Sequence, residues 1–403
     1  MTLADLLTPP SPRHPAVILP DDERTVTYAE LAQQVAAVAE QLGATGLSPG
    51  STVALVLPNG LESIVAFLAV SSCRLVAAPL NPAYKVEEFH FSLEDMGAAA
   101  VIAPPGDQAV RSAARGLGLP VWTARRSADG AVRLDDLPTG RGTSSERPRP
   151  DDVALFLHTS GTTSRPKGVP LTHANLMASV RNIVTHYRLT PSDVSLVVMP
   201  LFHVHGLIGV TLSSLRAGGT LVVPPRFSAS GFWPAVRRWR VSWYSAAPTI
   251  HQILLQRADA DDAPHRSGFR FIRSCSAALA PATLVQLESR FGAPVLEAYA
   301  MTEAAHQMCA NPLPPGVRKP GSVGPGSYVE VAIMDDGGDL LPVGTPGEVV
   351  VRGPNVMAGY RNNPEANRTA FTRGWFRTGD RGVLDADGYL TLIGRIKELI
   401  NRG

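Results

Sequence analysis

The sequence predicts an α/β protein with parallel sheets and an additional small β unit. Short apolar segments alternate with helical segments over residues 51–301, a rhythm typical of β-α-β units. After PGSVG at residues 320–324, short β segments rich in Gly, Asp and Pro predict a small antiparallel sheet or barrel. A length of 403 residues is too great for one simple core and indicates two or three packed units.

The elements follow in order. STVALVLP predicts a buried strand, GLESIVAFLAVSSC a helix and RLVAAPL another strand, and LPTGRGTSSERPRPDD predicts a surface loop. DVALFLH then predicts a strand, and LTHANLMASVRNIVTHY a helix with Thr172 as its N-cap. Further strands are expected at DVSLVVMP, GTLVVPP, VSWYSAAP, FRFIRSCSAA, APVLEAYAM, YVEVAIMD, GEVVVRG and GYLTLIG. We expect units at 1–195, 196–320 and 321–395, with a hinge at 396–403.

Composition excludes several classes of protein. With 44% hydrophobic residues, 18% charged residues and a net charge of +2, the chain gives no electrostatic reason to expect nucleic acid or an anionic membrane as partner. Three cysteines without C-x-x-C spacing indicate neither a disulfide framework nor a zinc site. No signal peptide or membrane span is recognisable. We therefore expect a cytoplasmic protein.

The loop HTSGTTSRPKGVP at residues 158–170 combines glycines, hydroxyls and a lysine between a predicted strand and a predicted helix. Backbone N–H groups, hydroxyls and a cation at that position favour phosphate binding. A Walker A loop does not fit, because Pro166 stands where its second glycine belongs and Gly168 follows Lys167. The alternative is a solvated turn. Lysine occurs only four times in the chain, which favours the functional interpretation.

Five strings occur in one order: TSGTTSRPKGV, PLFHVHG, EAYAMTEAAHQM, GWFRTGD and GRIKELINRG. Together they resemble the adenylate-forming enzymes, which include acyl-CoA synthetases, coumarate:CoA ligases, luciferases and adenylation domains. The resemblance covers most of the chain and implies the large N-terminal domain of that fold, with two parallel-sheet subdomains and a small β-barrel-like subdomain. It also implies ATP, Mg²⁺ and coenzyme A as cofactors, with activation of a carboxylic acid as acyl-AMP and transfer to CoA.

The resemblance assigns the nucleotide residues one by one. Tyr299 is expected to stack on adenine against the backbone of Ala277 and Ala278, while Asp380 and Arg395 are expected at the ribose. The phosphate loop is assigned Thr159, Ser160, Gly161, Thr162, Thr163 and Lys167, the α-phosphate Thr302, and the Mg²⁺ ion Glu303. Taken singly, Tyr299 could be a core aromatic and Asp380 a turn former. Their occurrence in family order favours the functional roles.

The acid pocket is predicted from Ser276 and His306. The resemblance implies that His203 and His205 flank it, with His205 where family members gate the acid or line the pocket entrance. Ser276 narrows the pocket and adds a hydroxyl, and His306 follows Glu303 by about one turn if a helix begins there. A hydroxyl and an imidazole suit a small polar acid better than a fatty chain. RSCSAALAP closely resembles the oxalyl-CoA synthetase branch, which implies oxalate. The alternative is that Ser276 bonds the backbone and His306 is structural.

Lys397 stands where the resemblance implies a hinge to a small mobile domain with a further catalytic lysine. The sequence ends at Gly403, within that motif, so we expect a cut or naturally short chain with weak activity by itself. Three alternatives stay open for function: an adenylation domain that loads an amino or aryl acid onto a carrier protein, a ligase for a larger biosynthetic acid, and a nucleotide sensor without turnover. His203 and His205 replace the aspartate expected in an amino-acid adenylation domain.

Overall fold

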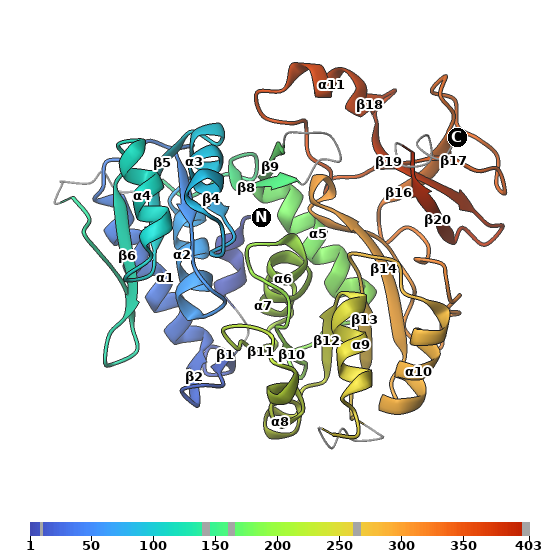
Figure 1. Ribbon diagram of the computed structural model, residues 1–403, viewed down its shortest axis with the longest axis horizontal. Helices are drawn as coiled ribbons and strands as arrows, with labels where there is room; N and C mark the ends of the chain where they lie inside the picture. Colours follow the sequence, from blue (N-terminus) through green and yellow to red (C-terminus); the bar gives the residue numbers. More distant parts are fainter. Residues whose placement is uncertain (9–10, 139–145, 160–165, 261–266, 397–403) are drawn as a thin grey trace.

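A computed structural model describes residues 1–8, 11–138, 146–159, 166–260 and 267–396. Three sheets organise these residues, as Figure 1 shows from the N-terminus in blue to the C-terminus in red. The first two sheets are mainly parallel and carry helices, and the third is antiparallel. The predicted α/β class is therefore confirmed. The pairings among the described residues do not close the third sheet into a barrel.

The first sheet has seven strands in the order β7-β6-β5-β3-β4-β8-β9. Its interior pairs are parallel, and both edges are antiparallel hairpins. The strands are β3 (Thr52–Leu55), β4 (Val76–Pro79), β5 (Ala98–Ala103), β6 (Val121–Arg126), β7 (Val132–Asp135), β8 (Val153–Thr159) and β9 (Lys167–Thr172), and the helices are α1 (Tyr28–Gly43), α2 (Leu61–Ser72), α3 (Val86–Asp95), α4 (Gln108–Gly116) and α5 (His173–His186). Thr172 caps α5 as predicted, because its side chain accepts the N–H of Asn175.

The second sheet has eight strands in the order β15-β14-β13-β12-β10-β11-β1-β2. The strands are β1 (Pro15–Leu19), β2 (Arg24–Thr27), β10 (Val194–Leu196), β11 (Thr220–Val222), β12 (Trp243–Ala246), β13 (Phe271–Ser274), β14 (Val295–Met301) and β15 (His306–Ala310). Its helical segments are η1 (Leu3–Leu7), α6 (Val204–Gly206), the π-helix η2 (Leu207–Leu212), α7 (Ser213–Ala217), α8 (Ala229–Trp239), α9 (Pro248–Gln256), α10 (Pro281–Phe291) and η3 (Thr302–Ala304). The unit boundaries expected from the sequence stay predictions, but residues 15–27 pair with this sheet rather than the first.

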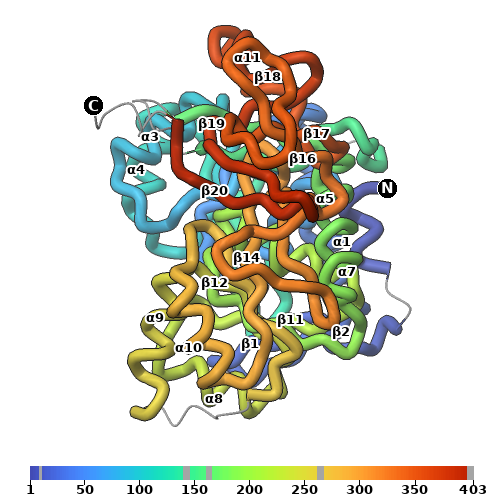
Figure 2. The backbone as a smooth tube through the Cα atoms, turned by 90° about the vertical axis from the view of Figure 1, so that its right-hand side faces the viewer, coloured from blue at the N-terminus to red at the C-terminus, as the bar shows by residue number. Residues whose placement is uncertain are grey.

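The third sheet stands over the end of β14, and Figure 2 shows it from the side. It contains β16 (Glu330–Met334), β17 (Gly347–Arg352), β18 (Phe371–Thr372), β19 (Trp375–Leu384) and β20 (Leu390–Arg395), with α11 (Pro364–Ala370) before β18. The segment that follows the second sheet also bonds to it: the Ser322 hydroxyl donates to the carbonyl of Leu390 over 2.8 Å. Asp380 and Arg395 lie opposite each other on β19 and β20.

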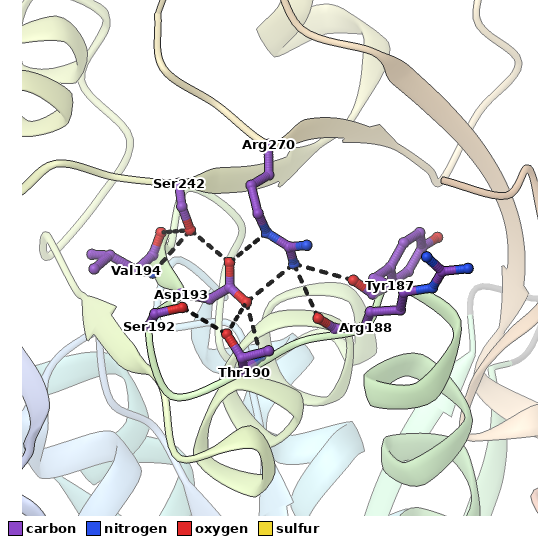
Figure 3. A network of polar contacts seen from close by, with 8 residues as sticks. All are labelled: Tyr187, Arg188, Thr190, Ser192, Asp193, Val194, Ser242 and Arg270. Atoms are coloured by element: carbon purple, nitrogen blue, oxygen red, sulfur yellow. Dashed lines mark hydrogen bonds and ion pairs between the residues drawn. The ribbon is translucent and has the colours of Figure 1, made fainter. Parts of the chain in front are cut away.

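Buried side chains hold the parallel layers together. Helix α2 has 10 buried residues out of 12, which is typical of a helix enclosed on all sides. At the amino ends of β10, β12 and β13, the buried carboxylate of Asp193 accepts from Arg270 Nε over 2.7 Å and from Ser242 Oγ over 2.9 Å (Figure 3). This paired charge fixes the ends of the strands that lie away from the candidate site.

Two sequence predictions differ locally from the structure. The phosphate loop was expected to lead from a strand directly into a helix, but β9 intervenes and pairs antiparallel with β8. His306 was expected on a helix that continues from Glu303, but η3 ends at Ala304 and His306 begins β15. Both differences have one cause: β9 and β15 are short strands, which hold too few residues for a recognisable period.

Candidate active site

A cavity of about 580 Å³ lies where the three sheets meet, at the carboxyl ends of the parallel strands. Open α/β sheets bind ligands at these ends. Its lining includes the predicted residues Thr159, Lys167, His203, Ser276, Thr302, Glu303, His306 and Arg395. A larger cavity of about 730 Å³, lined by Asp22, Glu62 and Arg126 among others, contains none of the predicted site residues. The chemistry-bearing side chains therefore gather in the first cavity.

The phosphate loop starts and ends at this cavity. Thr159 and Lys167 face each other as the last pair of the β8–β9 ladder, and both line the cavity. Ser160, Gly161, Thr162 and Thr163 lie outside the described residues, so their predicted contacts with phosphate stay predictions. The hairpin nevertheless anchors both ends of the segment at the cavity rim.

Lys167, Tyr360 and Glu303 form a continuous arrangement along one wall. The Lys167 ammonium lies 4.7 Å from the centroid of the Tyr360 ring, a cation–π distance. The Tyr360 hydroxyl donates to Glu303 Oε1 over 2.8 Å, and Glu303 is buried. Burial and the adjacent carboxylate raise the pKa of Tyr360 far above its usual value, so the hydroxyl stays protonated as a donor. Tyr360 thus orients Glu303 while the lysine charge remains near the cavity.

Tyr299, Asp380 and Arg395 lie together at the end of β14, as the resemblance implied. The Tyr299 hydroxyl donates to Asp380 Oδ2, and Arg395 Nε lies 2.8 Å from Asp380 Oδ1. Burial, with the charge of Asp380, holds the pKa of Tyr299 well above its usual value. The carboxylate is therefore fixed by one neutral donor and one cation.

Ser276 and His306 line the same cavity, each on strained backbone. Ser276 has φ +78° and His306 has φ +100°, conformations that a non-glycine residue adopts only when its surroundings require it. Ser276 is exposed, whereas only 1% of His306 is exposed. The structure thus places both residues of the predicted acid pocket in one cavity.

His205 lies behind Ser276 rather than at the pocket entrance, which corrects the position expected from the sequence. It is fully buried, and its ring nitrogens contact Ser276 Oγ at 2.8 Å and Ser245 Oγ at 2.6 Å. His203 is exposed and caps α6, with Nδ1 accepting the N–H of His205 over 3.2 Å. His203 can therefore contact a ligand directly, and His205 can act only through its neighbours.

Of the remaining predicted residues, the structure describes Thr302, Ala277 and Ala278 but not Lys397. Thr302 begins η3 at the cavity, and Ala277 and Ala278 are exposed directly after Ser276. Lys397 lies outside the described residues, so its hinge role stays a prediction. Sequence reasoning missed Tyr360 and the buried Arg273, which contacts His306. A signal for Arg273 was present, because FRFIRSCS places an arginine inside an apolar strand that should be buried on both faces.

Comparisons with known proteins define the class. The model of the AMP-binding enzyme family matches residues 9–361, so the chain belongs to that family. It is similar to a probable CoA ligase, CCL9, of Humulus lupulus, with 53% identity over 96% of this chain and 75% of that protein. It is also similar to an oxalate–CoA ligase of Arabidopsis thaliana, with 50% identity over 94% of this chain and 75% of that protein.

A solved structure of MatB from Rhodopseudomonas palustris with bound ATP has the same fold. It gives a TM-score of 0.88 at 32% identity and covers 98% of this chain and 79% of that one. The family expectation drawn from the five strings is therefore confirmed.

The donor set suits Mg²⁺. In the described chain, no group of three or more His, Cys, Asp or Glu side chains could enclose a metal ion, but Mg²⁺ usually takes one or two carboxylates and completes its shell with water and substrate phosphates. Glu303, a single oriented carboxylate on the cavity wall near Lys167, fits that requirement. When bound, the ion would neutralise phosphate charge.

Proposed function

We propose that this protein is an AMP-forming acid–CoA ligase whose acid is oxalate or a similarly small dicarboxylate. The observation that carries the proposal is that one cavity brings two kinds of side chain together. Lys167 and Glu303 line it beside the Asp380–Arg395 pair, and Ser276 and His306 line it as well. The first set suits a nucleotide, and the second suits a short polar acid. The oxalate–CoA ligase of Arabidopsis thaliana, at 50% identity, supports the same substrate.

The residues serve an in-line displacement. A carboxylate oxygen of the acid attacks the α-phosphorus of ATP, the bond to the bridging oxygen breaks, and pyrophosphate leaves. Lys167 and the hydroxyl of Thr302 offset the charge that accumulates on the phosphates, while Asp380 and Arg395 hold the ribose so that the α-phosphate stays aligned. The CoA thiolate then attacks the acyl carbon, and AMP leaves with the electron pair of the acyl–oxygen bond.

Coenzyme A is proposed as the acceptor in preference to a carrier protein. The relatives reported above with 50% and 53% identity are both named as CoA ligases. We also propose a cytoplasmic location, because Cys73, Cys275 and Cys309 are all buried thiols, as suits a reducing compartment. Among the described residues, no helix combines the length and apolar character that a bilayer crossing requires.

A panel of acids tests the function. Pyrophosphate release by the full-length protein with ATP and Mg²⁺ should be fastest with oxalate, slower with malonate and slowest with octanoate, because only a short acid can satisfy both Ser276 and His306. Phenylalanine serves as the control for an amino-acid adenylation domain. Faster release with octanoate or phenylalanine than with oxalate would contradict the proposal, and AMP binding without release by any acid would favour a nucleotide sensor.

A further inference from the structure

Arg273 is a fully buried cation whose charge no carboxylate balances. It lies on β13 with 0% exposure, and within the described residues no Asp or Glu oxygen comes within ion-pair distance of it. Arg270, three residues earlier, shows the usual solution, since it pairs with Asp193 (Figure 3). An unpaired buried guanidinium is costly, so its position on the acid side of the cavity calls for a chemical reason.

Neutral acceptors surround the Arg273 guanidinium. Its Nε donates to the Tyr187 hydroxyl over 3.0 Å and its Nη2 to Gln307 Oε1 over 2.9 Å. The other two bonds lead toward the cavity: Nη1 lies 3.2 Å from Ser245 Oγ and Nη2 lies 3.0 Å from His306 Nε2. The guanidinium can only donate, so both of these atoms must accept.

The contact between Arg273 Nη2 and His306 Nε2 fixes the tautomer of His306. Because Nε2 accepts from Arg273, the ring proton resides on Nδ1. Nδ1 is buried, and no partner for it exists among the described residues. His306 itself lines the cavity, and within the described chain this N–H is the one donor of its ring left without a partner.

The contact between Arg273 Nη1 and Ser245 Oγ fixes the direction of a longer chain of hydrogen bonds. Ser245 Oγ accepts from Arg273, and its own proton goes to His205 Nε2 at 2.6 Å. His205 therefore carries its proton on Nδ1 and donates to Ser276 Oγ at 2.8 Å. The Ser276 hydroxyl proton is then free to point into the cavity. This assignment gives each proton from Arg273 to His205 an acceptor, and it leaves the Ser276 hydroxyl as the donor at the end of the hydrogen-bond chain.

Both histidines are in the neutral state that these chains require. Burial first, and then the charge of Arg273, hold the pKa of His205 and of His306 well below the usual 6.5. A protonated imidazole would have to donate from both nitrogens and would oppose Arg273 or Ser245. The lowered pKa values and the hydrogen-bond geometry thus both indicate neutral imidazole rings.

We infer that Arg273 is the positioning residue that makes Ser276 Oγ and His306 Nδ1 obligate hydrogen-bond donors to the distal carboxylate of the acid. The inference rests on the proposed function and adds the source of its selectivity. An acid with a second anionic group accepts hydrogen bonds from both donors and balances the buried charge of Arg273. A monocarboxylate of similar size leaves two donors unpaired and is rejected.

The first test observes the tautomers without any substrate. In full-length protein with ¹⁵N-labelled histidine, nuclear magnetic resonance should show His205 and His306 protonated on Nδ1 only. Arg273→Met should leave both rings as tautomer mixtures, and Ser245→Ala should disturb His205 but not His306. Arg270→Lys is the matched control on the same strand and should leave both rings unchanged. A wild-type His306 with its proton on Nε2 would overturn the inference.

The second test is kinetic. Arg273→Met should raise the KM for oxalate by about tenfold or more, as expected for loss of charge-assisted donors, with the KM for ATP unchanged. If Arg273→Met fails to fold, Ser245→Ala interrupts only the hydrogen-bond chain that runs through His205 to Ser276. This variant should raise the oxalate KM by a smaller factor. An unchanged oxalate KM in the folded variants would overturn the inference. If the wild type shows the expected tautomers but does not turn over oxalate, the oxalate assignment is refuted. The direction of the hydrogen bonds from Arg273 to His306 and to Ser276 would still hold.

Discussion

Asp380, on β19, shows how one side chain reaches a functional geometry through partners from two other strands. Tyr299 arrives from β14 and Arg395 from β20, and both bind the Asp380 carboxylate. Motif order predicted that these residues act together, but not that the tyrosine hydroxyl contacts the aspartate. That contact joins residues 81 positions apart, and no local pattern encodes it. The role of Arg273 was missed for a similar reason: its position in an apolar strand signals burial, but its partners come from three separate segments, at Tyr187, Ser245 and His306–Gln307.

At this scale, Asp380→Asn should weaken AMP binding. The substitution removes the negative charge that we propose to accept the ribose hydroxyls, and each charge-assisted hydrogen bond is worth about 1.5–3 kcal/mol. Calorimetry should therefore show at least a tenfold loss of affinity. Asp385→Asn is the matched control, because Asp385 lies at the β19–β20 turn with a side chain that is 42% exposed and pairs with Lys319. Equal AMP affinity in both variants would contradict the assignment of the ribose site.

Among the elements, the π-helix η2 makes room for the acid pocket. Gly209 lies on it, and a Cβ added there would come within 2.2 Å of His306 Nε2 and 3.1 Å of Arg273 Nη1. π-Helical turns often occur at functional sites, and here the turn presents a residue without a side chain to the buried pair. Alternation of strands and helices predicted most elements, whereas η2 lies in the uniformly apolar segment LIGVTL, where periodicity is uninformative.

Gly209→Ala should accordingly impair acid binding with little effect on the nucleotide. Over-packing of a buried site costs about 1–3 kcal/mol, and the displaced group here is His306 with its Arg273 contact. We expect a KM for oxalate raised about fivefold to a hundredfold, with the KM for ATP near the wild-type value. Gly43→Ala, where an added Cβ meets nothing within 4 Å, is the control. A larger change in the KM for ATP than for oxalate would refute this role of η2.

Across the whole molecule, the site exists only because three sheets converge. Lys167 comes from the first sheet, Ser276 and His306 from the second, and Asp380 and Arg395 from the third. The sequence predicted the class of fold and the residues that gather. It did not predict that residues 15–27 complete the second sheet, because pairing between distant strands depends on global packing and not on local pattern.

Buried histidines should make the stability of the whole molecule depend on pH. Burial lowers the pKa of His173 and of His251 to about 4. In the unfolded chain these rings take up a proton below about pH 6.5, so the free energy of unfolding should fall as the pH decreases from about 6.5 to about 4, by up to about 3 kcal/mol for each ring. Glu297, whose pKa burial raises to about 7, acts in the opposite direction.

Thermal unfolding at several pH values checks this expectation. The Tm should be lower near pH 5 than near pH 7. His173→Gln retains an acceptor for the N–H of Leu3 and should reduce the slope of stability against pH. A slope that is flat in the wild type, or identical in the variant, would contradict the assignment of neutral buried histidines.

The fate of one oxygen atom tests the central claim most directly. When oxalate labelled with ¹⁸O in its carboxylates reacts with ATP and CoA on the full-length protein, attack of a carboxylate oxygen on the α-phosphorus must leave one labelled oxygen in AMP after the thioester forms. We expect mass spectrometry to find that label in AMP, together with labelled oxalyl-CoA. Unlabelled AMP, or label in inorganic phosphate beside ADP, would contradict activation through an acyl adenylate.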